Sequence, residues 1–137
     1  MNNTIIYREI LSDAQRINQT AQRFGAAFSM KVEPVIYDMA AMLSVEYQGG
    51  YWDIFKLSNQ GLYMAPCTEK KFAASSPNGY TGTLSADALG ITACLFAFSH
   101  LSFDNDALAA ICSQHFHWLR EYAIDHAEVQ AILAATD

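Results

Sequence analysis

Residues 47–66 constrain the fold more than any other stretch of this chain. Four tyrosine and tryptophan rings, one phenylalanine and three glycines lie within these twenty residues. Two β-prone runs, 51–57 and 62–65, flank a Ser-Asn-Gln-Gly segment. Asn and Gly tolerate the positive φ angles of tight hairpin turns, so the pattern predicts an antiparallel β-hairpin.

The role of the aromatic rings in this hairpin has two interpretations. Alternation along the first run places Tyr51 on one face of the strand and Trp52 on the other. Trp52 is either a core residue, with the glycines serving only to turn the chain, or part of an exposed Tyr/Trp patch. Such patches are enriched in binding hot spots, and the sequence leaves both interpretations open.

Further strands and helices follow from turn residues and apolar spacing. Residues 71–74 and 80–84 form two short β-prone runs around the turn segment 75–79. Their short connection requires antiparallel pairing. A helix over about 12–24 is predicted from apolar spacing, with a cap at Ser12 or Asp13 and a stop at Gly25. Its expected apolar face is Leu11, Ala14, Ile17, Ala21 and Phe24.

Four more helices are expected. One begins near Glu33 and Pro34 and ends before Gly49, with Val35, Ile36, Met39, Met42 and Leu43 as its core stripe. The next is capped by Ser85, is apolar nearly all round, and is therefore predicted to occupy the centre of the fold. The last two cover about 104–125 and 127–135.

The fold class predicted from these elements is α+β. We expect residues 1–137 to form a single compact domain with a small antiparallel sheet of about three to four strands within residues 51–84, packed with about four to five helices. Residues 1–10 match none of these elements, and we interpret them as a poorly ordered or variable N-terminal segment.

Composition narrows the cellular context. Hydrophobic residues make up 52% of the chain and charged residues 16%, as in globular proteins. No apolar run reaches the ~18 residues of a membrane span, and the N-terminus lacks the pattern of a signal peptide. Three scattered cysteines make a disulfide framework improbable. We therefore predict a cytoplasmic protein without membrane contact.

The formal net charge of −6 argues against direct sequence-specific binding of nucleic acid, which needs clustered cations. It also raises an alternative function, a DNA-mimic inhibitor that occupies a DNA-binding channel. Glu121, Asp125 and Glu128 would line up as an acidic edge if a helix continued through residue 126. Arg16 and Arg23 fall on one side of the first helix, either as a solvated basic face or as a functional one.

Residues with catalytic or metal-binding potential are few. Cys112 and His115 are three apart on a helix, but two ligands do not make a metal site. Cys67 lies in an expected loop and has no local nucleophile motif. Phosphate-binding and nucleophile-elbow motifs are absent from the sequence. We therefore predict no catalytic residues, no metal and no cofactor.

Three segments of the chain resemble the ArdB/KlcA antirestriction family. They are Tyr47-x-Gly49-Gly50-x-Trp52, then Leu57-Ser58-Asn59-x-Gly61-x-Tyr63-Met64-Ala65-Pro66, and Leu84-Ser85-Ala86-Asp87-x-x-Gly90-Ile91. Weaker similarity covers about residues 11–135, including Arg16 and the run 23–25. One departure lies in the hairpin turn, where members usually have Asn-Gly-Gly and this chain has Gln60 in the middle position.

The resemblance implies a compact α+β protein of plasmids and other mobile elements. Such proteins protect incoming DNA from type I restriction-modification enzymes of the host, without catalysis. The expected partner is such an enzyme or another DNA-processing complex, and the protein itself is expected to be a monomer or weak homodimer. The residues that we predict to bind are Arg16, Tyr47, Tyr51, Trp52, Asn59 and Tyr63, and those with structural roles are Gly49, Gly50, Gly61, Pro66, Ser85 and Asp87.

Overall fold

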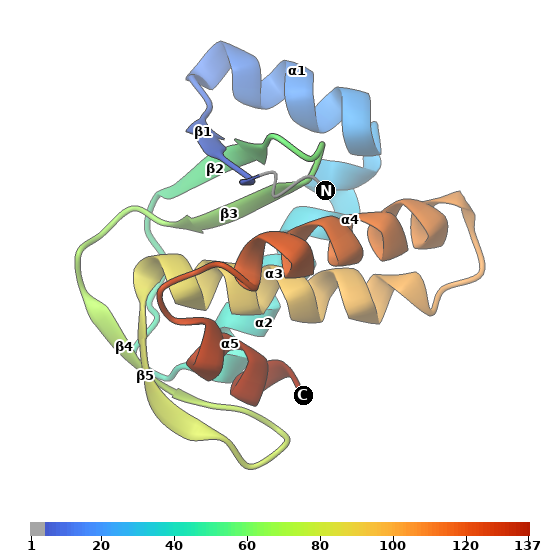
Figure 1. Cartoon of the computed structure of the whole chain (residues 1–137). Helices are drawn as coiled ribbons and strands as arrows, with labels where there is room; N and C mark the ends of the chain where they lie inside the picture. The colour runs from blue at the N-terminus through green and yellow to red at the C-terminus, as the bar shows by residue number, and fades with distance from the viewer. Residues whose placement is uncertain (1–4) are drawn as a thin grey trace.

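A computed structural model describes residues 5–137 of the chain, so residues 1–4 of the expected N-terminal segment lie outside it. The elements in chain order are β1 (Arg8–Ile10), α1 (Asp13–Phe24), the π-helix η1 (Phe28–Val32), α2 (Glu33–Leu43), β2 (Trp52–Leu57), β3 (Leu62–Pro66), β4 (Lys71–Ser75), β5 (Thr81–Ser85), α3 (Ala86–Ser102), α4 (Ala107–Ala123) and α5 (Val129–Thr136). The α+β prediction is confirmed (Figure 1).

The strands form two small antiparallel sheets. The first has the order β1-β2-β3, and the second pairs β4 with β5. The predicted hairpin is β2–β3, in which Phe55 pairs with Tyr63 and Lys56 with Leu62. Residues 8–10, which we had interpreted as poorly ordered or variable, instead pair with β2 as an edge strand. Their pairing partners lie more than forty residues away, so local sequence patterns gave no sign of this strand.

Helix α3 occupies the centre of the molecule, as its all-round apolar character predicted. It lies between the three-stranded sheet and α5 and runs beside α4 (Figure 1). Twelve of its seventeen residues are buried. At Gly90, an added Cβ would lie 2.4 Å from both the Ala65 Cβ and the Met64 carbonyl oxygen. The glycine therefore lets the helix backbone lie directly against β3.

The predicted helix caps are confirmed at several positions. The Ser12 side chain accepts from the Gln15 N–H in a capping box, and Ser85 accepts from the Ala88 N–H. The C-terminal boundaries were less accurate. Helix α2 ends at Leu43 rather than near residue 48, and α4 ends at Ala123 rather than near residue 125. The π-helix η1 before α2 was not predicted.

The predicted apolar face of α1 is wrong in its middle. Ile17 is 72% exposed, and Ala14 and Ala21 are exposed too, whereas Thr20 is buried and Arg16 and Arg23 are partly buried. The arginines face inward because they donate hydrogen bonds to the hairpin backbone: Arg16 to the Trp52 carbonyl at 2.7 Å and Arg23 to the Gln60 carbonyl at 3.2 Å. Similarly, Met42 of the expected α2 stripe is 44% exposed, and Ala40 is buried instead.

None of the helices in residues 5–137 combines the length and apolar character needed to cross a lipid bilayer.

Replacement of Gly90 tests the contact between α3 and β3. Gly→Ala in a helix normally stabilises by about 1 kcal/mol. Here the new methyl group would meet backbone atoms that cannot rotate away. We expect Gly90→Ala to lower the free energy of unfolding by about 2–3 kcal/mol, measured by urea denaturation. A stabilised variant would contradict the close approach.

Replacement of Gln60 tests the strained turn. Gln60 has φ 83°, the left-handed region that favours glycine. We expect Gln60→Gly to raise the free energy of unfolding by about 0.5–1 kcal/mol. Gln60→Ala is the matched control, because it removes the side chain and keeps the strain. Equal stability of the two variants would exclude a contribution from the backbone conformation.

Candidate functional site

Four of the predicted binding residues lie together at the start of the hairpin. The Arg16 guanidinium donates to the Tyr51 hydroxyl at 2.9 Å and to the Trp52 carbonyl at 2.7 Å, and it lies 4.8 Å from the centre of the Tyr51 ring. The Trp52 indole N–H donates to the Tyr47 hydroxyl at 3.0 Å. We call Arg16, Tyr47, Tyr51 and Trp52 the Arg16 cluster.

The two aromatic residues of β2 and its entry have opposite environments. Trp52 is 1% exposed and packs edge-on against Tyr37 and Tyr47, so it belongs to the core and offers a partner no surface. Tyr51 is 58% exposed. The open question about Trp52 is therefore answered in favour of the core, and the exposed part of the Arg16 cluster is Tyr51 with the edges of Arg16 and Tyr47.

Local backbone geometry positions this surface. Gly49 and Gly50, just before Tyr51, have φ angles of 91° and 112°, which residues with a Cβ rarely adopt. Their chain segment is exposed, and an added Cβ at either position would meet no atom within 4 Å. The glycines are thus required by their positive φ angles, because a side chain at either position would meet no steric clash. They turn the chain into β2 and leave Tyr51 beneath Arg16.

Asn59 lies at the other end of the hairpin. Its amide donates to the Trp118 carbonyl and to the Glu121 carboxylate, both at 2.9 Å, and its side-chain oxygen accepts from the Gly61 N–H. At Gly61, a Cβ would lie 2.9 Å from the Trp118 Cβ. These two residues dock the turn onto α4, so Asn59 does not join the Arg16 cluster.

Tyr63 is fully buried and belongs to a polar network beneath the sheet. Its hydroxyl donates to Asp87 Oδ1 at 2.7 Å and accepts from Arg8 Nη1 at 2.8 Å. Arg8 also bonds Asp87 directly at 2.6 Å. His126 Nε2 lies 2.8 Å from Asp87 Oδ2. This network joins β1, β3, α3 and the segment after α4, which makes direct partner contact by Tyr63 untenable.

The charge states in this network follow from its contacts. The Glu128 backbone N–H donates to His126 Nδ1, which places the neutral ring's proton on Nε2, facing Asp87. Burial alone would raise the pKa of Asp87, but hydrogen bonds from His126 and Tyr63 and the charge of Arg8 outweigh it and lower the pKa. Burial and Asp87 raise the pKa of Tyr63. Asp87 is therefore a fully bonded carboxylate at neutral pH.

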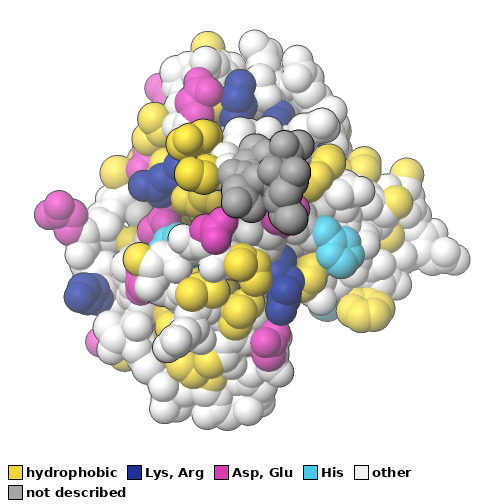
Figure 2. Space-filling model, viewed as in Figure 1, with side chains coloured by type: hydrophobic (Ala, Val, Ile, Leu, Met, Phe, Trp, Pro, Cys, Tyr) yellow, Lys and Arg dark blue, Asp and Glu magenta, His cyan; other side chains and the backbone are white. Residues whose placement is uncertain are grey.

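The predicted acidic edge does not form. The helix stops at Ala123, and the carboxylates bond different elements. Glu121 accepts from Asn59, and Glu128 accepts from the N–H and hydroxyl of Ser85. On the face in Figure 2, acidic and basic side chains are interspersed. A mimic needs a continuous row of carboxylates, because B-DNA carries one charge per ~1.7 Å.

Catalytic and metal-binding arrangements gain no support. The part of the chain that the structure describes contains no group of three His, Cys, Asp or Glu side chains placed to hold a metal ion. Cys67 is exposed, and a hydrogen bond to Asp53 raises the pKa of its thiol, which opposes formation of the nucleophilic thiolate. Cys94 and Cys112 are buried, and burial raises their thiol pKa values to about 12 and about 11.

Two residues of the Asp87 network escaped the sequence analysis. Arg8 lies in the segment that we had interpreted as poorly ordered or variable, and His126 lies between the last two predicted helices. Both act on Asp87 across long sequence separations. The sequence contains no signal that relates either residue to Asp87.

Comparison with known proteins gives a consistent result. The model of a family described as antirestriction protein matches residues 45–137. The antirestriction protein KlcA of Escherichia coli is 36% identical over 132 residues, covering 93% of this chain and 92% of that protein. The uncharacterized protein YafX of E. coli K12 is 37% identical over 131 residues, covering 91% and 84% of the two chains.

A solved structure agrees over the whole chain, with a TM-score of 0.89, 36% identity and full coverage of both chains. It comes from work on the KlcA and ArdB proteins, which are described as showing a novel fold and antirestriction activity against type I DNA restriction systems in vivo but not in vitro. Fold and sequence thus define the same class of protein. The chain belongs to the antirestriction protein family.

The Asp87 network predicts an acid-dependent contribution to stability. The pKa of Asp87 is lower in the folded protein than its ordinary 3.8, so the stabilisation is present at neutral pH and disappears as the pH falls through the folded-state value. We expect Asp87→Asn to lower the free energy of unfolding by about 2–4 kcal/mol at pH 7.

Urea denaturation from pH 7 to pH 3 measures this effect, and the gap between wild type and Asp87→Asn should narrow below pH 4. Asp125→Asn, at an exposed position, is the control and should change stability by less than about 0.5 kcal/mol. A gap that stays constant down to pH 3 would show that the charge of Asp87 contributes nothing.

Proposed function

We propose that this protein relieves restriction of incoming DNA by type I restriction-modification enzymes, without catalysis, through the exposed surface of the Arg16 cluster. It acts in the cytoplasm on a protein partner, directly or through another DNA-processing complex. It is a monomer or weak homodimer, folded as one domain, and does not bind nucleic acid sequence-specifically.

The exposure of Tyr51, with the Arg16 guanidinium over its ring, is the observation that carries this proposal. Tyrosine and arginine are enriched among the residues that dominate protein interfaces. The Tyr51 ring is held by Arg16 from one side, and its hydroxyl lies 3.4 Å from Asp13. Little conformational freedom therefore remains to be lost when a partner binds.

Indirect action fits what is described for the relative with a solved structure, which acts in vivo but not in vitro. A direct inhibitor of the restriction enzyme needs only the two purified proteins. An inhibitor that works through a further cellular component loses its effect when that component is missing. We extend this interpretation to the present chain because the two share 36% identity over their full lengths.

Replacement of Tyr51 tests the surface. Phage plating efficiency is measured in cells with a type I restriction system, with and without the expressed chain. We expect Tyr51→Ala to reduce the relief of restriction at least tenfold, because truncation removes the exposed ring and leaves the core intact. Tyr7→Ala is the matched control, since Tyr7 is 66% exposed outside the cluster, and it should keep full relief.

Immunoblotting confirms equal amounts of the variants. Full relief by Tyr51→Ala would exclude this surface, and absence of relief by the wild-type chain would exclude the function. The double variant Glu121→Gln, Asp125→Asn tests DNA mimicry and leaves Glu128, which supports Ser85, in place. Loss of most relief in this variant would favour mimicry, because mimicry is electrostatic.

A further inference from the structure

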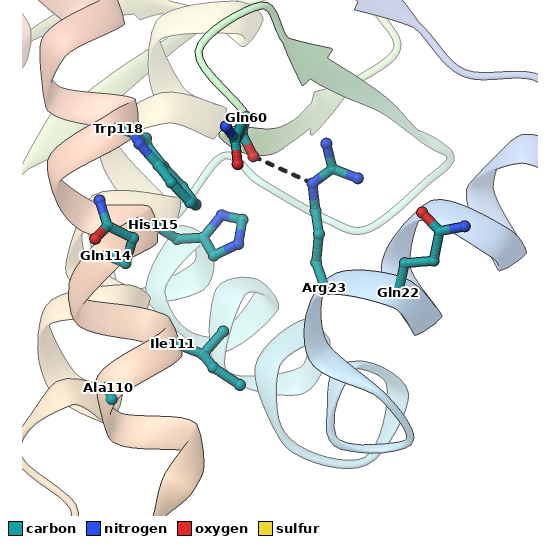
Figure 3. A pocket seen from close by; sticks show the side chains of 8 residues that line it. All are labelled: Gln22, Arg23, Gln60, Ala110, Ile111, Gln114, His115 and Trp118. Carbon is teal, nitrogen blue, oxygen red and sulfur yellow. Dashed lines mark hydrogen bonds between the residues drawn. The ribbon is translucent and has the colours of Figure 1, made fainter.

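A pocket of about 520 Å³ lies at the far end of α1 from Tyr51. Its walls come from α1, the β2–β3 turn and α4, and eight residues line it: Gln22, Arg23, Gln60, Ala110, Ile111, Gln114, His115 and Trp118 (Figure 3). Pockets of about 300–1,000 Å³ are the usual size for small ligands. None of the functions considered so far uses it.

Arg23 gives this pocket a positive charge without a counter-ion. It is the only charged residue of the eight, and no ion pair among residues 5–137 includes it. Its guanidinium donates to the Gln60 carbonyl and the Gln19 side chain, both neutral acceptors. Burial lowers the pKa of Arg23, which reflects lost hydration without a compensating anion. A partly desolvated guanidinium is well suited to phosphate or carboxylate.

His115 adds a second, independent indication of a ligand. His115 is only 2% exposed, and its Nδ1 atom is buried with no hydrogen-bond partner among the described residues. An unpaired buried polar atom destabilises the fold, because it has lost its hydrogen bonds to water without gaining a partner. Figure 3 shows the imidazole pointing from α4 across the pocket toward Arg23. Burial and the charge of Arg23 lower the pKa of His115 to about 4, so the ring is neutral at pH 7.

The remaining walls combine a planar ring with amides. Trp118 is half-buried and meets the His115 ring edge-on at 5.1 Å, and Ile111 adds an aliphatic side. Gln22, Gln60 and Gln114 supply groups that both donate and accept hydrogen bonds. Aromatic surfaces bind nucleobases by stacking, and amides match the donor and acceptor pattern of base edges.

We propose that this pocket binds a nucleotide, with its phosphate on Arg23, its base against Trp118, and the base edge bonded by the glutamine amides. The pocket has one cation, whereas binding along a strand needs several. A free mononucleotide therefore fits better than the end of a nucleic acid strand. The proposal goes beyond restriction relief, and its test needs only the purified chain.

The test is an NMR titration of the full-length chain at pH 7 with AMP, GMP, CMP and UMP, each up to 10 mM. We expect saturable shifts of the Trp118 indole N–H and the His115 ring with at least one of them. The bound phosphate should also raise the pKa of His115, because it offsets the charge of Arg23. Absence of saturable shifts with all four nucleotides would overturn the proposal.

Two arginine variants test whether the phosphate of the ligand binds at Arg23. We expect Arg23→Gln to weaken binding at least tenfold, with a native-like dispersed NMR spectrum as the check of folding. Arg120→Gln is the matched control, because Arg120 lies on α4, does not line the pocket and pairs with Asp137. It should bind like wild type. Equal weakening in both variants would contradict a phosphate contact at Arg23.

Two further probes distinguish a free nucleotide from inorganic phosphate and from a nucleic acid strand. Inorganic phosphate should bind at least tenfold more weakly than the best nucleotide, and equal affinity would overturn recognition of the base. A ten-residue oligothymidylate should bind no more tightly than the mononucleotides. Tighter binding with steep salt dependence would overturn the free mononucleotide in favour of a strand.

Discussion

The contact of α3 with β3 is the interaction on which the rest of the structure depends. Gly90 allows the two backbones to touch, and the Cys94 thiol lies 3.6 Å from the Met64 carbonyl oxygen at the same place. Helix α3 also packs against α2, α4 and α5. Once β3 is fixed on this helix, β2 follows by pairing and α4 by its contact with the turn at Gly61. The hairpin is therefore held along its length by contacts that do not involve α1.

Helix α1 is attached by the buried Phe24 ring at its end and by polar contacts along its length. Arg16 and Arg23 are seven residues apart, so they project from one side of the helix and reach backbone carbonyls at the two ends of β2 and its turn. Carbonyl groups that leave water need hydrogen-bond donors, and long arginine side chains supply them. This explains why Ile17 stays exposed: in the middle of the helix, the inward face is defined by the acceptors opposite it.

Sequence patterns predicted those parts of the fold that depend on local chemistry. Ser12 and Ser85 marked helix starts because a cap acts over three residues, and the all-round apolar character of residues 86–102 predicted the central helix. Strand β1 and the role of His126 were missed, because they depend on partners far along the chain. Six binding residues proposed from the sequence divide among three places, since neighbours along a hairpin need not share an environment.

The turn residue Gln60 illustrates the same limit. Its residue type indicates a different turn, yet its φ of 83° is the conformation that a glycine would adopt. The docking of Asn59 and Gly61 on α4 imposes this conformation, so tertiary contacts outweigh the local preference. The Gln60 side chain also adds an amide to the wall of the pocket beside Arg23.

The Arg16 cluster and the Arg23 pocket are connected by two rigid elements, α1 and β2. Neither arginine takes part in an ion pair among residues 5–137, although the chain has a net charge of −6. The guanidinium that faces the pocket also holds the end of α1 on the turn. If a ligand bound at Arg23 weakened this hydrogen bond, α1 would shift on the hairpin, and Arg16 would carry that shift to Tyr51. Coupling of this kind is reciprocal, so a partner bound at Tyr51 would change the affinity of the pocket by the same factor.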